Sequence, residues 1–412
     1  MLIKKSCILV LAACLVSGCS VNEVITAEVN ELHVAEAAPL EDLLLDIGVV
    51  EFDDGVPKNN EPSKTGIYEE VRLAEVRYLP YHLKTTLQAT GHWGAVRVIP
   101  SRSAFTDVII SGEIEKSDGE FVELRVMVED AMGHKWYEKS YATQTGISSY
   151  NEYRDRTTDP YQNVFNDIAN DLREYVAAMP AKEIQQIRQV SELQFFGDMA
   201  PLTFGDHLGT NKDGTVSIVR LPAENDPMVA RLRQIRERDR LVVDTLNEHY
   251  ANFYYGIATP YEGWRKISRE EQVNYRQVRR SAAMRTLLGV VVLAGSVAME
   301  TDNSSSSSTR RMKRGIQTVG ISQGLETIIS GLTRRSEAKM HIEAIKELSE
   351  SFGSESAPMV VTVEGETRRL TGTAAAQYES WRRLLKQIYE AETGFSGDAD
   401  VSVPTRGNQP TG

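Results

Sequence analysis

The chain has 412 residues, of which 41% are apolar and 25% are charged, and its formal net charge at pH 7 is −12. This length and apolar content predict two or three domains with hydrophobic cores. The acidic balance argues against nonspecific nucleic-acid binding, which depends on clustered basic charge. We therefore expect no nucleic-acid partner.

The first nineteen residues have the order of a bacterial secretory signal. Lys4 and Lys5 form a short basic start, an apolar run from Ser6 to Leu15 follows, and Val16-Ser17-Gly18-Cys19 places small residues before a cysteine. This order is typical of a cleaved signal peptide, and it resembles the lipobox of bacterial lipoproteins. In that family the cysteine becomes the first residue and carries acyl chains. The resemblance implies a signal peptide over 1–18 and palmitate on Cys19.

An ordinary cleaved signal and a short membrane helix are the alternatives. The apolar run is shorter than the roughly 20 residues that span a bilayer. A second candidate box, Leu11-Ala12-Ala13-Cys14, leaves too little apolar sequence before it. Ser20 follows Cys19, and a residue other than Asp there implies, in enterobacterial lipoproteins, sorting to the outer membrane. We expect an anchor facing the periplasm, and two or three acyl chains would hold it stably.

Cysteine usage agrees with this interpretation. Cys7, Cys14 and Cys19 are the three cysteines of the chain. After cleavage before Cys19 one modified cysteine remains, so the mature chain is expected to form no disulfide, thiolate metal site or cysteine nucleophile.

Residues 19–44 are polar and acidic and predict a tether. Residues 45–180 then alternate between strand and helix patterns, which predicts an α+β domain with one mixed sheet and helices on one face. The helix over 69–90 contains Pro80, where we expect a kink or a break, and Gly91 is a plausible stop. Ser117-Asp118-Gly119 predicts a tight turn between two strands. The expected strands are 46–52, 95–99, 107–115, 121–129 and 135–141, and a second helix is expected over 159–179.

The element order and strand texture of residues 45–180 resemble a known family. The segments that carry the resemblance are Ile47-Gly48-Val49-Val50-Glu51-Phe52, Gly91-His92-Trp93, the strand from Asp107 to Ile114, and the strand and turn from Phe121 to Met132. They look like the amino-terminal domain of TolB and the related domain of curli-secretion-type lipoproteins. Members of that family are non-enzymatic envelope proteins that bind protein partners or assemble into rings.

Residues 181–225 look irregular, and residues 226–353 predict a mainly helical region that begins with Asp226 as N-cap and Pro227 at the first helical position. Within it, residues 286–332 predict a helical hairpin with a serine-rich tip, whose Gly289, Gly295, Gly320 and Gly324 allow close helix approach. Two interpretations stay open: a hairpin packed on the protein or on a second copy, and insertion into a membrane as part of an oligomeric pore. A β-hairpin and helix over 354–394 and a disordered tail over 395–412 follow.

The sequence shows no pattern that carries catalysis. None of its seven histidines pairs at a zinc-ligand spacing, and no nucleophile elbow, Walker loop or dinucleotide fingerprint occurs. The Asp206, Asn211 and Asp213 cluster does not fit a calcium loop. We therefore expect no enzyme, no metal and no cofactor. The expected function is a lipid-anchored outer-membrane component that binds an envelope protein or its own copies; a pore former and a cell-wall enzyme are the alternatives.

Overall fold

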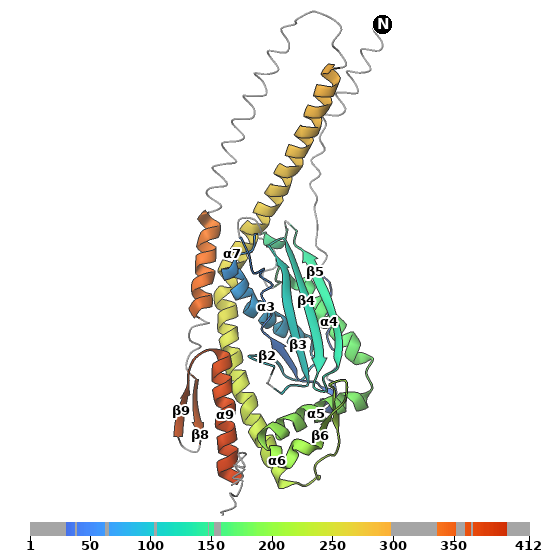
Figure 1. The fold of residues 1–412 in the computed structure, drawn as a ribbon, viewed down its shortest axis with the longest axis vertical. Coiled ribbons are helices and arrows are strands. Elements are labelled where there is room, and N and C mark those ends of the chain that lie inside the picture. The colour runs from blue at the N-terminus through green and yellow to red at the C-terminus, as the bar shows by residue number, and fades with distance from the viewer. Residues whose placement is uncertain are drawn as a thin grey trace, which may run out of the picture.

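The computed structural model describes residues 30–37, 39–61, 66–102, 105–146, 148–151, 158–297, 336–351, 359–363 and 366–393. The signal peptide, Cys19, Gly320, Gly324 and the tail over 395–412 lie outside the described residues. An α+β body carries a single long helix, α7, which extends well past the sheet (Figure 1).

One five-stranded mixed sheet organises the body, as predicted. Its strands lie in the order β2-β1-β3-β4-β5. β1 pairs in parallel with β2 and with β3, and β3, β4 and β5 form an antiparallel meander. The strands are β1 (Ile47–Val50), β2 (Val96–Ile99), β3 (Val108–Ser117), β4 (Phe121–Asp130) and β5 (Lys135–Gln144). The predicted α+β class with a mixed sheet is confirmed.

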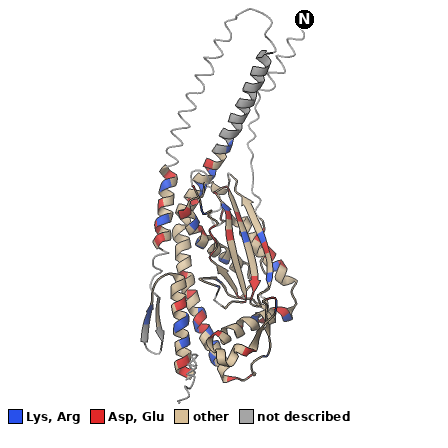
Figure 2. Cartoon of the chain, viewed as in Figure 1, with Lys and Arg blue, Asp and Glu red and all other residues tan. Residues whose placement is uncertain are grey.

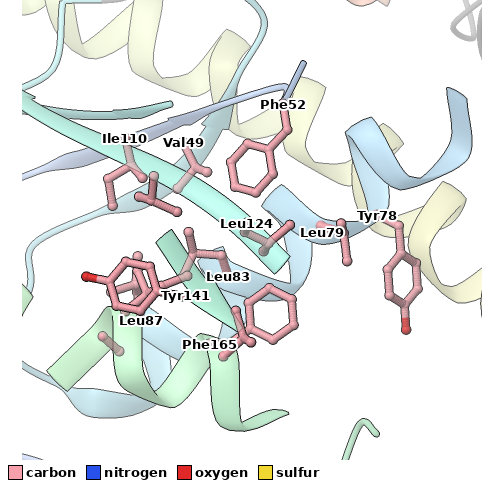
Figure 3. Packing of buried hydrophobic residues seen from close by; sticks show 14 of the residues in the cluster. Val49, Phe52, Tyr78, Leu79, Leu83, Leu87, Ile110, Leu124, Tyr141 and Phe165 are labelled. Carbon is pink, nitrogen blue, oxygen red and sulfur yellow. The ribbon is translucent and has the colours of Figure 1, made fainter. Parts of the chain in front are cut away.

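Helices α3 (Glu69–Thr90) and α4 (Gln162–Ala177) cover one face of this sheet. The alternation of β4 explains why: Leu124 and Val126 are fully buried, whereas Arg125 between them is exposed. Figure 3 shows Leu124 packing near Leu83 of α3 and Phe165 of α4. On the opposite face Arg125 pairs with Glu113 and Glu115 of β3, so that face of the meander is polar, as antiparallel sheets permit.

Helix α3 runs through Pro80 without a break and ends at Gly91, which has a left-handed φ of 68°. The predicted break is therefore wrong, the predicted kink stays a prediction, and the predicted stop is confirmed. Pro80 is buried between Leu79 and Tyr81, which are buried too. Tertiary packing outweighs the hydrogen bond that proline cannot donate.

The segment expected to be irregular, 181–225, begins with a 19-residue helix, α5 (Ala181–Met199). The prediction is wrong there because α5 buries a broad face that does not follow one narrow stripe, including Ile187, Val190, Phe195 and Phe196. Short elements follow: α6 (Pro201–Phe204), η3 (Gly205–His207), β6 (Leu208–Thr210) and β7 (Val216–Ile218).

The rest of the described chain is built around α7 (Pro227–Val297), a continuous helix of 71 residues and about 105 Å. Its N-terminal half forms a second core with α5 and with α9 (Ala374–Thr393). The hairpin of β8 (Met359–Val363) and β9 (Glu366–Leu370) precedes α9, and a helix over 336–351 lies beside α7 (Figure 1). No helix among the described residues has an apolar stretch long enough to cross a membrane.

The C-terminal part of the expected tether, from residue 30 onward, is bonded to the body. Asn30 and His33 bond to side chains of α4, and η1 (Glu41–Leu43) bonds to α5 through Arg188 and Gln185. The prediction of a plain tether over 19–44 is therefore wrong from residue 30 onward.

Candidate functional site

The sequence-predicted site residues fall into two groups. Gly289 and Gly295 lie on the C-terminal part of α7, the part that extends past the sheet (Figure 1). Cys19, Gly320 and Gly324 lie outside the described residues. What the described side chains build is the attachment of α7 to the body, and that attachment is the candidate site.

The attachment of α7 begins at its N-terminus. The backbone N–H of Met228 donates to Asp226 Oδ1 at 2.8 Å, and Pro227 is the first helical residue. Proline fits this position because a first-turn N–H has no partner within the helix. The predicted N-cap is confirmed.

A buried ion pair fixes the middle of α7. Arg265 donates from Nη1 and Nη2 to the two carboxylate oxygens of Asp159, at 2.8 and 2.9 Å. The side chains are 2% and 7% exposed. The guanidinium also lies 4.3 Å from the ring centre of Tyr261 and 4.9 Å from that of Tyr161, which adds cation–π attraction.

The electrostatics of this pair follow from its burial. Burial alone would raise the pKa of Asp159, but the charge of Arg265, together with the further charge and hydrogen bonds around the carboxylate, holds that pKa well below its ordinary value. Burial would likewise lower the pKa of Arg265, and Asp159 raises it. Both groups therefore stay charged inside the body, and each depends on the other.

Next to this pair, Glu75 of α3 lies fully buried. Its Oε1 accepts hydrogen bonds from Ser117 Oγ at 2.5 Å and from Tyr261 Oη at 2.7 Å. Its other oxygen lies 3.4 Å from Arg72 Nη1. Burial raises the pKa of Glu75, although Arg72 and the two hydroxyls oppose that rise. One carboxylate thus joins α3, β3 and α7.

His82 of α3 forms a third buried link to α7. Gln162 uses its amide N–H groups on Thr86 and Asn166, so its oxygen faces His82 Nε2 at 2.9 Å and accepts that N–H. Tyr254 of α7 then donates its hydroxyl to His82 Nδ1 at 2.7 Å. Burial lowers the pKa of His82, which favours this neutral form.

The β3–β4 turn contacts the backbone of α7 directly. Gly119 has a φ of +81°, and a Cβ placed there would lie 2.1 Å from the carbonyl oxygen of Arg265. The adjacent Glu120 is buried and pairs with Arg276. Arg276 lies about three turns of α7 beyond Arg265, on the same side of the helix. The predicted turn at Ser117–Gly119 is confirmed, and its glycine allows the turn to approach the helix.

Further toward its N-terminus, α7 covers the edge of the sheet. Asn247 accepts the backbone N–H of Val98 at 2.8 Å and donates to the carbonyl of the same residue at 2.9 Å. One side-chain amide therefore satisfies both main-chain groups that β2 presents at this edge position. Covering an edge in this way prevents pairing with another chain.

Helix α9 completes the attachment from the other side. Asp239 of α7 is buried and accepts hydrogen bonds from Tyr378 at 3.3 Å and Trp381 at 3.2 Å. Arg382 ion-pairs with Asp239 and with Asp198 of α5. The N-terminal half of α7 is thus held between α5 and α9.

A polar cavity of about 530 Å³ lies along the contact of α5 and α7. Its guanidinium groups bond within the protein: Arg233 to Glu192 at 2.8 Å, Arg236 to Ser191 at 2.6 Å, and Arg240 to Asp46 at 2.8 Å. Burial, followed by the charge of Arg240, lowers the pKa of Arg236. The three arginines therefore bond α7 to α5 and to Asp46, the residue before β1.

The described residues hold no group of three or more His, Cys, Asp or Glu side chains placed to bind a metal ion. Positive and negative residues alternate along the ribbon of the described body in Figure 2. The described side chains of α7, Arg276 among them, bond it to the sheet, to α3, to α5 and to α9. The C-terminal part of α7 extends past the sheet (Figure 1).

Sequence reasoning missed the residues that attach α7. Arg265 and Asp159 are 106 positions apart, and Asn247 and Val98 are 149 apart. The available signal was local: an aromatic series, Tyr254, Tyr261 and Trp264, on a helix that otherwise reads as highly charged. Aromatic residues at helical spacing indicate a buried face.

No family model matches the chain, and no curated protein matches it. Among solved structures, it is similar to a PelC variant dodecamer from Paraburkholderia phytofirmans, with 14% identity over 36% of this chain and 94% of that one, and with a TM-score of 0.18. A TM-score this low does not establish a shared fold.

Proposed function

We propose that the chain is a non-enzymatic, lipid-anchored component of an outer-membrane assembly or export system, and that it binds an envelope protein or its own copies. The anchor is Cys19, on the strength of the basic, apolar and small-residue order before it. The TolB-like and curli-secretion-like order of residues 45–180 supports a binding role over catalysis. The proposed location is the outer membrane, on its periplasmic side.

The single observation that carries the binding role is the attachment of α7. Buried contacts of Arg265, Asn247 and Glu75 fix the direction of the helix relative to the sheet. The helix then extends past the body (Figure 1). A helix that is fixed at one end and projects at the other can bind a partner with a smaller loss of conformational entropy than a mobile segment.

Site-specific crosslinking in cells tests this function. A photo-crosslinking residue replaces Val291 on the projecting part of α7, and the matched control replaces Leu241, which is 66% exposed on the attached part. We expect a discrete adduct, with a partner or with a second copy, from position 291 and a weaker or absent one from position 241. A strictly monomeric protein without adducts from position 291 contradicts the proposal.

A second candidate is membrane insertion through residues 286–332. The apolar run from Leu287 to Ala294 belongs to the C-terminal part of α7, and contact of this run with lipid is the alternative to a hairpin packed on the body. Full mature chain and a variant lacking Thr286–Leu332 are compared for binding to liposomes and for leakage of a trapped dye. Equal behaviour of the two chains rules out insertion.

A further inference from the structure

Helix α4 carries a row of asparagines that binds an extended segment of the chain. Asn163 Oδ1 accepts the backbone N–H of Asn30 at 2.9 Å, and Asn166 Nδ2 donates to the carbonyl of Asn30 at 2.6 Å. One turn further, Asn170 donates to the carbonyl of Glu31 at 2.8 Å and accepts the N–H of His33 at 2.9 Å. The asparagines are three and four residues apart and therefore lie on one face of the helix.

The bound segment, residues 30–37, is called the strap below. Four of its bonds to the asparagine row use main-chain atoms, and the N–H of Ala35 donates to the carbonyl of Thr90 at 2.8 Å. Such bonds hold the strap's backbone whatever side chains it carries. Leu32 packs against the main core, whereas Val34 is 57% exposed. The strap is thus held mostly by polar contacts near the surface, which open more easily than a packed core.

The next attachment along the chain is separate. Arg188 of α5 donates to the carbonyl of Glu41 at 2.7 Å, and Gln185 donates to Asp42 at 3.1 Å. Release of the strap from α4 therefore leaves η1 attached to α5, and the body need not unfold. The chain between Cys19 and the body is therefore short when the strap is bound to α4, and longer when only η1 is bound to α5.

We propose that the strap is a releasable spacer that sets how far the body stands from the membrane, a role that rests on the proposed lipidation of Cys19. Asn30 lies eleven positions after Cys19, so the docked state reaches at most about 40 Å. Leu40 lies twenty-one positions after Cys19, which extends the reach to at most about 75 Å after release.

The test variant is the full mature chain with Asn163→Ala and Asn170→Ala; Asn166 is left in place because it is buried. The matched control is Glu174→Ala, an exposed change on the same helix. By hydrogen–deuterium exchange, we expect the amides of Asn30 and His33 to exchange about tenfold faster in the double variant, each having lost a bond. Amides of β4 and the control protein stay unchanged. Equally fast exchange in the parent chain, or equal protection in the double variant, overturns the strap.

The spacing is measured on the lipidated chain in vesicles. A dye on Lys182→Cys, an exposed position on α5, transfers energy to acceptor-labelled lipids, and the double variant is expected to show lower transfer than the control. Equal transfer overturns the spacer. Incorporation of labelled palmitate is measured separately, with Cys19→Ala as control, and its absence overturns the proposed anchor. The hydrogen–deuterium exchange result tests the strap whether or not the chain carries lipid.

Discussion

Arg265 of α7 and Asp159, which precedes α4, form a bidentate ion pair inside the body, with both N–O distances below 3 Å. The pair connects the middle of the projecting helix to the layer that covers the sheet. Two charges removed from water are tolerable only while both are present. This mutual dependence makes the pair a sensitive test of how α7 is attached.

Asp159→Asn is expected to destabilise the protein by about 3–5 kcal/mol, because it leaves the Arg265 charge buried without its counter-charge. Urea denaturation measures the loss. The matched control is Asp159→Asn combined with Arg265→Met, which removes both charges and is expected to cost less than the sum of the two single changes. Additive losses would show that the two side chains do not act as a pair.

The buried His82 predicts a dependence of stability on pH. Its folded-state pKa lies below the unfolded value of about 6.5. Stability is therefore full above that unfolded value, and it falls as the pH drops from there through the folded-state pKa, because the unfolded chain binds the proton first. One such group contributes a slope of at most about 1.4 kcal/mol per pH unit.

His82→Gln is expected to flatten this slope between pH 7 and pH 5, since glutamine does not titrate. Free energies of unfolding at half-unit intervals of pH give the slope. Leu73→Gln, at a position of α3 that is 48% exposed, removes no titratable group and is the control, which should leave the slope unchanged. A parent-like slope in the His82 variant would place the proton uptake elsewhere.

How far the sequence led can be judged from particular elements. The alternation of β4 and the turn at Gly119 predicted the sheet, because each is a local pattern with one structural solution. The expectation that residues 181–199 are irregular was wrong. Their apolar residues do not form one narrow helical stripe, and they are buried because α7 and the edge strand of the sheet pack against the helix. Pro80 failed as a breaker for the same reason: burial of its neighbours outweighs one missing bond.

The attachment of α7 could not be predicted from spacing. Arg265 belongs to a stretch rich in charged residues, and such a stretch reads as a solvated helix face. Its partner, Asp159, looked like the start of α4, a common position for an acidic residue. Only the three-dimensional arrangement shows that the two meet among tyrosines.

Gly119 offers a test of the contact between the sheet and α7. Gly119→Ala is expected to cost about 2–4 kcal/mol, because the new Cβ meets the Arg265 carbonyl in addition to the strain of a left-handed φ. Gly133→Ala is the matched control: its φ is also +81°, but the nearest atom to the new Cβ is 3.8 Å away. Its cost should be about 1–2 kcal/mol.

The difference between the two glycine variants isolates the close approach to α7. Urea denaturation gives both values, and limited proteolysis of α7 should be faster in the Gly119 variant, since the turn pushes the helix away. Equal stability losses at the two positions would mean that the turn and the helix are not in contact in solution.

Asn247 tests whether α7 protects the edge of the sheet. Asn247→Ala leaves the buried N–H and C=O of Val98 without their partner, which is expected to cost about 1–3 kcal/mol. Asn247→Asp is the informative comparison, because a carboxylate still accepts the N–H but cannot donate to the carbonyl. Exchange of the Val98 amide should therefore accelerate in the alanine variant and stay slow in the aspartate variant. If both variants exchange like the parent, the amide of Val98 is protected by packing alone; if the alanine variant also self-associates, the uncovered β2 edge is available for pairing.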